Sequence, residues 1–198
     1  MNQYWSQHRE DRWIVEHLEL PEKGVFVEVG AYDGIELSNT YHFEQKGWTG
    51  LCIEADPRQW HKLLLNRTCD KFFGAAGPCG NVEFGMMDIP SHSGIGRGGA
   101  SIKVPSLPLG VLLDSYKIRH VDILSLDTEG TELDVWESGL FRTHLPYPRI
   151  VIIEWETAGL PPAKDAIMAH FATLPYMLMH ETAGNLIFER TRALPEGE

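Results

Sequence analysis

Short apolar runs alternate along this chain with helix-like segments. The runs are rich in β-branched and aromatic residues, which is typical of strands that are buried on both faces of a sheet. Strands that alternate with helices build parallel βαβ units. The runs that we interpret as parallel strands lie at 25–29, 49–54, 71–76, 121–126 and 149–153.

The helix-like segments carry recognisable boundary signals. Asp56 and Pro57 suit the first positions of a helix, and Gly47 suits the position just after one. The first helix, over 6–18, is expected either to pack on the edge of the sheet or to cover a bound ligand. The other helices are expected at 35–46, from 57 onward, at 109–116, from 131 to 138 and at 161–174.

The C-terminal part predicts a different strand pairing. Runs at 176–180 and 185–190 are joined by an Ala-Gly turn and are expected to form an antiparallel pair. A hairpin is also predicted near 80–84. We therefore expect one α/β domain over 1–198, with a mainly parallel sheet and an N-terminal helical segment over 1–22.

The segment 88–103 does not fit this alternation of strands and helices. It is rich in glycine, and a connection of this length in a compact domain is usually functional or disordered. We interpret it as a mobile lid near the strand tips. His92 is its one imidazole, which is either a solvated loop residue or a candidate catalytic base.

A glycine-bearing turn follows the first strand, where an open α/β sheet binds its ligand. A dinucleotide fingerprint needs the spacing G-x-G-x-x-G, but after Gly30 the other two positions hold Tyr32 and Ile35. This mismatch speaks against an NAD enzyme. Glu54 ends the second strand, where a carboxylate can accept hydrogen bonds from both hydroxyls of a ribose. A tight structural turn is the alternative interpretation.

Two alanines, Ala75 and Ala76, end the third strand. Small residues at a strand tip allow a flat ring to lie close to the backbone, so this pair predicts an adenine pocket. Tight packing against a neighbouring helix would explain the pair equally well.

Acidic residues follow the fourth and fifth strands. Asp127 and Glu154 end these strands, and Glu129 lies just beyond Asp127. Adjacent parallel strands end at the same edge of a sheet, so these carboxylates are expected to converge. One could act as a general base, and Asp127 with Glu154 could hold Mg²⁺, which favours oxygen ligands. For Glu129 and Glu132 the alternative is a structural role at the start of a helix.

Composition narrows the range of partners. The chain has 17 Lys and Arg against 28 Asp and Glu, a net charge of -11. Nucleic acids and acidic membranes require a basic surface, so neither is expected as a partner. Three cysteines without metal-type spacing indicate a reducing compartment. With no run of membrane-spanning length, we expect a cytoplasmic protein whose oligomeric state is left open.

Four stretches of the chain read FVEVGAYDG, SNT, GWTGLCIEADP and VDILSLDTEGTE. With these motifs the chain resembles the FkbM family of methyltransferases over 6–190. Two departures are modest: Tyr32 stands where the family often has Asn, and Ala55-Asp56 replaces a commoner Pro-Asn. The segment 88–103 matches least, and substrate choice is expected to lie there.

The resemblance implies a Rossmann-like class I methyltransferase fold. Its sheet is expected to be seven-stranded and mainly parallel, with one antiparallel strand and helices on both faces. It also implies O-methylation of a small-molecule or sugar hydroxyl with S-adenosylmethionine as cofactor. The catalytic candidates are Asp127, Glu129, Glu154 and His92. The cofactor candidates are Glu28, Gly30, Ala31, Asp33, Gly34, Ser38, Asn39, Glu54, Ala55, Ala75, Ala76 and Asp127.

Two other functions remain open from the sequence. The chain could bind the cofactor without catalysing transfer and serve as a silent partner subunit. It could also be a nucleotide-sugar or NAD enzyme on the same fold, against which the missing second glycine argues.

Overall fold

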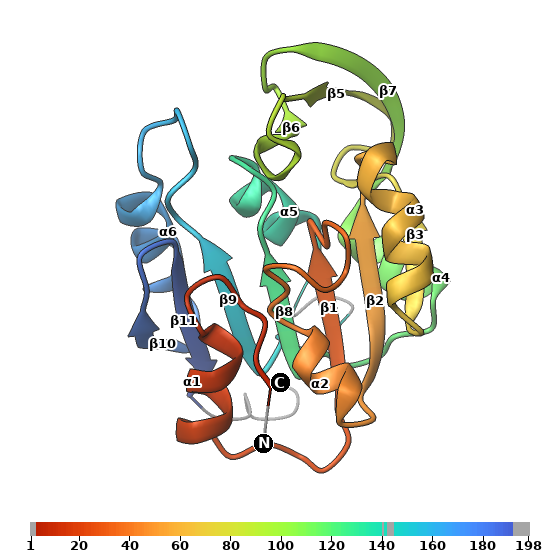
Figure 1. Cartoon of the computed structure of the whole chain (residues 1–198). Coiled ribbons are helices and arrows are strands. Elements are labelled where there is room, and N and C mark those ends of the chain that lie inside the picture. The colour runs from red at the N-terminus through yellow and green to blue at the C-terminus, as the bar shows by residue number, and fades with distance from the viewer. Residues whose placement is uncertain (1–2, 140, 142–144, 192–198) are drawn as a thin grey trace.

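The predicted seven-stranded sheet forms the centre of the molecule (Figure 1). The structure is a computed structural model that describes residues 3–139, 141 and 145–191. Strand β11 runs antiparallel to β10 and β9, while the remaining neighbours pair in parallel, as predicted. In spatial order the strands are β10 (Tyr176–Glu181), β11 (Asn185–Arg190), β9 (Ile150–Glu154), β8 (Ile123–Leu126), β1 (Val25–Val29), β2 (Thr49–Glu54) and β3 (Asp70–Phe73).

Helices cover both faces of this sheet, because alternate residues of each buried strand point to opposite sides. On one face, Ile14, Phe43 and Leu63 pack against Phe26 and Ile152. The opposite face forms a second core around the helices within 109–171. The first group comprises α1 (Glu10–His17), α2 (Tyr41–Gln45) and α3 (Pro57–Asn66), and the second comprises α4 (Leu109–Ser115), α5 (Glu132–Ser138) and α6 (Lys164–Phe171).

The helix expected over 35–46 is shorter than predicted and begins at Tyr41. The preceding residues form a loop whose amides bind side chains instead of helical carbonyls. Asp33 Oδ1 accepts hydrogen bonds from the amides of Ile35 and Glu36. Leu37 has φ 63, a left-handed conformation that interrupts any helix.

The strand expected over 71–76 is divided between two sheets. Gly74, with φ 145, separates β3 from β4 (Ala75–Ala76). Strand β4 pairs with β7 and joins a second sheet. The two alanines therefore end no strand of the main sheet, but they lie directly beyond its edge strand.

The second, four-stranded sheet was not predicted beyond its first hairpin strand. Its order is β4-β7-β5-β6, with β5 at Gly80–Met86, β6 at Gly94–Ile95 and β7 at Ala100–Leu107. The expected loop over 88–103 is thus interrupted by β6, by a 3₁₀ turn at Pro90–His92 and by the start of β7. We call these four strands the cap sheet, since it stands over the carboxyl ends of the main strands (Figure 1).

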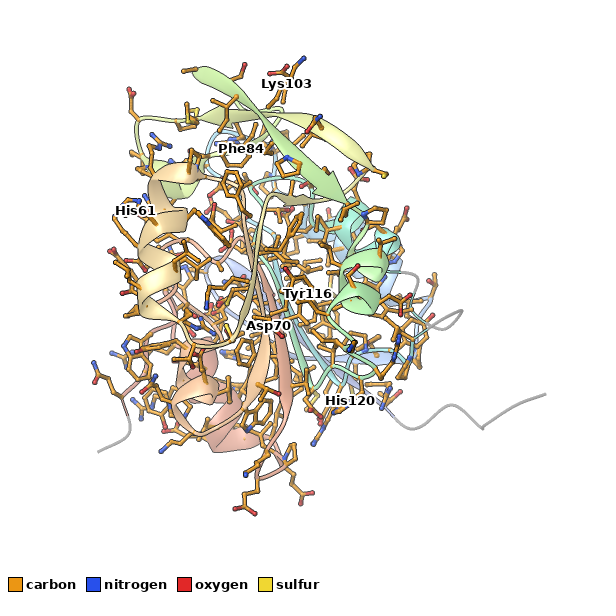
Figure 2. All side chains as sticks on the ribbon, turned by 90° about the vertical axis from the view of Figure 1, so that its right-hand side faces the viewer. His61, Asp70, Phe84, Lys103, Tyr116 and His120 are labelled. Carbon is orange, nitrogen blue, oxygen red and sulfur yellow. The ribbon has the colours of Figure 1, made fainter. Side chains whose placement is uncertain are left out.

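The cap sheet has an apolar face toward the main sheet and a polar outer face. Phe84 and Val104 are buried and pack with Ala55 and Ala75 in a third core. Figure 2 shows Phe84 beneath the cap sheet and Lys103 on its outer side. The strand β7 follows the period of two that this arrangement requires, with Val104 and Ser106 buried between exposed neighbours.

No helix in the described ranges 3–139, 141 and 145–191 is long and apolar enough to cross a bilayer. The cytoplasmic location that we expect from the sequence stays a prediction.

Candidate active site

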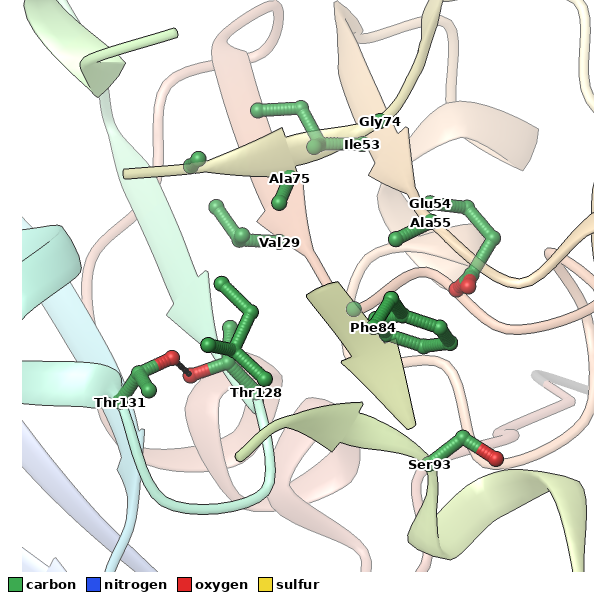
Figure 3. Close-up of a pocket in the computed structure, with 13 residues that line it drawn as sticks. Val29, Ile53, Glu54, Ala55, Gly74, Ala75, Phe84, Ser93, Thr128 and Thr131 are labelled. Atoms are coloured by element: carbon green, nitrogen blue, oxygen red, sulfur yellow. Dashed lines mark hydrogen bonds between the residues drawn. The ribbon is translucent and has the colours of Figure 1, made fainter. Parts of the chain in front are cut away.

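Two cavities open where β1 and β2 end, at the switch in strand order between β1 and β8. The first cavity lies under the cap sheet, and its walls are mostly apolar (Figure 3). The cap sheet supplies Phe84 and Ile95, which sequence analysis did not select. Its lining residues are Val29, Gly30, Ile53, Glu54, Ala55, Gly74, Ala75, Ala76, Phe84, Ser93, Ile95, Thr128 and Thr131.

The second cavity is more polar and lies over the loop that follows β1. Gly30 and Glu54 line both cavities, so one extended ligand can occupy the two in sequence. The lining of the second cavity is Glu28, Gly30, Ala31, Tyr32, Glu36, Leu37, Ser38, Asn39, Glu54, Pro90, Ser91, Ser125 and Asp127.

Glu54 stands between the two cavities and is fixed by backbone amides. Its Oε2 accepts a hydrogen bond of 2.7 Å from the amide of Tyr32, and its Oε1 accepts one of 2.6 Å from Asp56. Burial raises the pKa of Glu54 to about 7. A carboxylate has about four acceptor positions, so the side chain retains capacity for two hydroxyl donors of a ligand.

The turn after β1 requires glycine at its first position. Gly30 has φ 82, and a Cβ there would lie 1.7 Å from the carbonyl oxygen of Asp127. Tyr32 follows with φ 52, a left-handed conformation that Asn tolerates better than Tyr. This conformation directs the Tyr32 amide to Glu54, and nothing in the structure explains why Tyr stands here in place of Asn.

Glu28 does not end in the second cavity as a free carboxylate. It accepts hydrogen bonds from the hydroxyl of Ser38, the amide of Asn39 and the hydroxyl of Thr40, each within 3.0 Å. Arg67 Nη1 lies 3.0 Å from its Oε2, and both side chains are almost fully buried. Glu28 thus orders the loop that presents Ser38 and Asn39 to the cavity.

Arg67 is the most important residue of this region that sequence analysis missed. Its guanidinium also binds the carbonyl of Gly34 and pairs with Glu44. No local motif identifies it, because its partner Glu28 is 39 positions away in the chain.

Two cofactor candidates, Asp33 and Gly34, lie outside the lining of both cavities. Asp33 closes the turn through the amides of Ile35 and Glu36. Gly34 has φ 88, and a Cβ there would lie 2.7 Å from carbon atoms of Leu63 and Arg67. These contacts give both residues a role in shaping the loop.

The three predicted acids do converge beside the second cavity. Asp127, Glu129 and Glu154 each offer a carboxylate oxygen, and these oxygens lie within 4.8 Å of one another. Asp127 lines the cavity, and its side chain is hydrogen-bonded to that of Glu154. We call these three residues the acid cluster.

Burial and mutual repulsion favour protons in the acid cluster. Burial, reinforced by Glu132, raises the pKa of Asp127 to about 7. Burial and the nearby Asp127 raise the pKa of Glu129 to about 8 and that of Glu154 to about 11. A protonated Glu154 that donates to Asp127 is the arrangement that satisfies both side chains.

Glu129 has an incompletely satisfied carboxylate. It has φ 61, and its Oε2 is buried without a hydrogen-bond partner. Arg97, in the turn between β6 and β7, approaches this oxygen to 3.8 Å. It also donates hydrogen bonds to the carbonyls of His92 and Ala158. Glu132 differs, because its Oε1 accepts from the amides of Thr128 and Gly130 and so has the structural role that the sequence left open.

His92 ends the 3₁₀ turn at Pro90–His92, between β5 and β6. It does not line either cavity and is not one of the residues of the acid cluster. Its carbonyl binds Arg97, which gives the residue a backbone role.

Comparison with known proteins bears on the family and the fold of this chain. A family model described as the methyltransferase FkbM domain matches residues 28–178. A solved methyltransferase FkbM from Methylobacillus flagellatus has a TM-score of 0.56 at 13% identity, covering 88% of this chain and 45% of that chain. The present chain therefore spans less than half of that protein. Among curated proteins, none matches significantly in sequence.

Two further structures contain fibrillarin. A fibrillarin/Nop5p complex has a TM-score of 0.56 at 9% identity, covering 94% of this chain and 81% of that chain. Fibrillarin from Methanococcus jannaschii has a TM-score of 0.54 at 11% identity, with coverages of 94% and 75%. Identities this low establish the shared class I methyltransferase fold alone. The family match extends over most of the length and includes the turn after β1, the strand β2 and the acid cluster, and so this chain belongs to the FkbM methyltransferase family.

Proposed function

We propose that this methyltransferase transfers a methyl group from S-adenosylmethionine to a hydroxyl of a sugar or another small molecule. The observation that carries the proposal is the pair of unlike cavities that meet at Gly30 and Glu54. An apolar cavity suits a flat base, and a polar one suits an amino-acid end. A buried carboxylate between them suits the ribose diol that joins the two.

The individual contacts follow from this orientation. The adenine would lie against Ala55, Ala75 and Ala76 beneath Phe84. The methionine end would lie over Ala31, Ser38 and Asn39.

Asp127 is our candidate for the general base. The bound cofactor supplies an electrophilic methyl group, and the chain must align an acceptor oxygen with it and exclude water. An Asp127 carboxylate would take the proton of the acceptor hydroxyl as its oxygen is methylated. A pKa of about 7 suits this transfer near neutral pH. Glu129 and Glu154 would set the protonation of Asp127, and His92 is the second candidate base.

Mg²⁺ is a further candidate at the acid cluster. Three carboxylates with oxygens within 4.8 Å match the ligands of a hard cation. The buried Glu129 Oε2 without a hydrogen-bond partner supports this assignment. Asp127 and Glu154 would complete the set of protein ligands.

Calorimetry with S-adenosylhomocysteine and with NAD tests the cofactor assignment. We expect the first to bind and the second not to bind. Glu54→Ala should weaken binding by about 1–3 kcal/mol, the scale of hydrogen bonds to a charged group. Glu137→Ala removes an exposed acid of α5 that lies away from the two cavities, and it serves as the control. Tight NAD binding, or equal affinity in the Glu54→Ala and Glu137→Ala proteins, would contradict the assignment.

A screen of hydroxyl acceptors with methyl-labelled cofactor tests the reaction. On an accepted substrate, Asp127→Asn should lower turnover by about 10²–10⁴-fold, the usual contribution of a general base. Affinity for S-adenosylhomocysteine should change little. Normal turnover in the Asp127→Asn protein would exclude Asp127 as the base.

The silent partner subunit is the second candidate function. Its signature would be tight binding of S-adenosylhomocysteine together with no transfer to any acceptor in the screen. The acid cluster favours the enzyme, because a purely structural carboxylate would be paired as Glu28 is.

A further inference from the structure

Two cysteine thiols touch in the core on the face of the main sheet that α1, α2 and α3 cover. Cys52 lies on β2, and Cys69 lies directly before the neighbouring strand β3. Their sulfur atoms are 3.5 Å apart. Cys52 is fully buried and Cys69 is half-buried. The third cysteine, Cys79, is exposed and lies in the turn between β4 and β5.

We propose that Cys52 and Cys69 form a site of reversible thiol oxidation whose product is an intramolecular disulfide. The oxidant is a hydroperoxide that reaches the half-buried Cys69 first. This modification is independent of the proposed methyl acceptor, because no atom of either cavity takes part.

The reaction has two balanced steps. The Cys69 thiolate attacks the peroxide, so that a sulfur–oxygen bond forms, the oxygen–oxygen bond breaks, and an alcohol or water leaves. The Cys52 sulfur then attacks Cys69, forming the sulfur–sulfur bond and releasing water. Both thiols lose their protons and together give two electrons to the peroxide.

The geometry requires only a short approach of the two sulfurs. A disulfide has a sulfur–sulfur distance of about 2.05 Å, and the thiols already lie at 3.5 Å. Cys69 precedes β3, the last strand of the main sheet, and its amide and carbonyl bond to the side chains of Glu44 and Lys71. Burial raises the pKa of the Cys52 thiol well above its usual range, so Cys52 stays a neutral thiol until Cys69 has reacted and then gives its proton to the departing hydroxide.

The cysteine pair is also connected to the cavity wall. The Cys52 thiol lies 3.9 Å from Oε2 of Glu28, the carboxylate that holds Ser38 and Asn39. Forming the disulfide removes this sulfur donor. Glu28 keeps its bonds to Ser38, Asn39, Thr40 and Arg67 when this contact is lost.

Peroxide treatment of the full-length Cys79→Ser protein tests the proposal. The intact mass should fall by two hydrogens, and dithiothreitol should restore it. Trypsin should release the peptides 47–58 and 68–71 as one linked species. Cys52→Ser in the same background should form no such link, and a sulfenic-acid probe should label its Cys69.

Three results would overturn the proposal. The first is recovery of both thiols free after treatment, and the second is sulfinic acid at Cys69 beside a free Cys52. The third is a linked product that appears only between two copies of the chain. If Cys52→Ser does not fold, the linked peptide in the Cys79→Ser protein decides the question alone.

Discussion

Two sets of carboxylates lie at the same edge of the main sheet, and their surroundings differ. Glu28 is paired with Arg67 and accepts hydrogen bonds from Ser38, Asn39 and Thr40. The acid cluster lies one and two strands away, and Arg97 approaches it only to 3.8 Å. The Glu28 carboxylate thus has a cation and several hydrogen-bond donors, whereas the acid cluster leaves the buried Oε2 of Glu129 without a hydrogen bond.

These surroundings distinguish a carboxylate that orders a loop from carboxylates that can exchange protons or bind a ligand. A carboxylate held by a cation and several donors has no free position for a proton or a ligand. A carboxylate among other acids holds protons until higher pH. The order of the Glu28 loop and the reactivity of Asp127 therefore arise from opposite uses of the same chemical group.

The largest expected effect on stability comes from removing the cation that pairs with Glu28. Arg67→Met should lower the free energy of unfolding by about 3–5 kcal/mol, because it leaves Glu28 buried without its cation. Urea denaturation measures this loss. The matched control is Arg12→Met, which removes a pair with Glu16 that is 45% exposed on both sides and should leave the free energy of unfolding almost unchanged. Equal losses in the two proteins would refute the contrast.

The acid cluster should make stability depend on pH in a definite direction. Asp127, Glu129 and Glu154 have pKa values of about 7, 8 and 11, above those of ordinary carboxyl groups. The folded state then binds more protons than the unfolded state, so stability falls as pH rises above about 4.5. Between pH 5 and 8 the free energy of unfolding should decrease, by up to about 1.4 kcal/mol per pH unit for each carboxyl group that keeps its proton in the folded state alone. A stability that rises over this interval would contradict the raised pKa values.

Glu154→Gln sharpens the same point. The amide retains a donor toward Asp127 but removes the cost of keeping a carboxyl group protonated at pH 8. We expect the free energy of unfolding at pH 8 to increase by about 1–3 kcal/mol, with little change at pH 5. Glu137→Gln on the exposed face of α5 serves as the control and should change neither value. Destabilisation by Glu154→Gln at pH 8 would assign the residue a structural role.

The smallest expected effect concerns Mg²⁺. A cation held by the acid cluster should raise the melting temperature at pH 8 by a few degrees, equivalent to about 1 kcal/mol at several times the dissociation constant. EDTA should reverse the shift. Glu129→Gln should abolish it, because the buried oxygen is then lost. An identical shift in the Glu129→Gln protein would place the ion elsewhere.

The parts of the fold that follow from local pattern were predictable. The runs at 121–126 and 149–153 correspond to β8 and β9, and the acids that follow them converge as expected. The β10 and β11 pair was confirmed in position and direction. These features depend on residues that are close in sequence and on a general rule for parallel sheets.

The features that were missed depend on distant contacts. Arg67 acquires its role from Glu28, and nothing near it in sequence signals a buried cation. In β7 the alternation of Ile102, Val104 and Ser106 was present, but Pro105 and the preceding glycines concealed it. The early part of the segment 35–46 has helical composition, yet the carboxylates of Glu28 and Asp33 capture its amides.

The cap sheet enters and leaves the main fold at a single place. Its first and last strands, β4 and β7, are direct neighbours, with Ala75 beside Ser106 and Ala76 beside Leu107. The segment between them can therefore be lengthened, shortened or exchanged without altering the order of the main strands. A segment transplanted from another protein, in evolution or by engineering, needs to match only the adjoining ends at β4 and β7. Within such a family, the covering of the base-sized cavity can diversify by recombination while the turn after β1 is inherited intact.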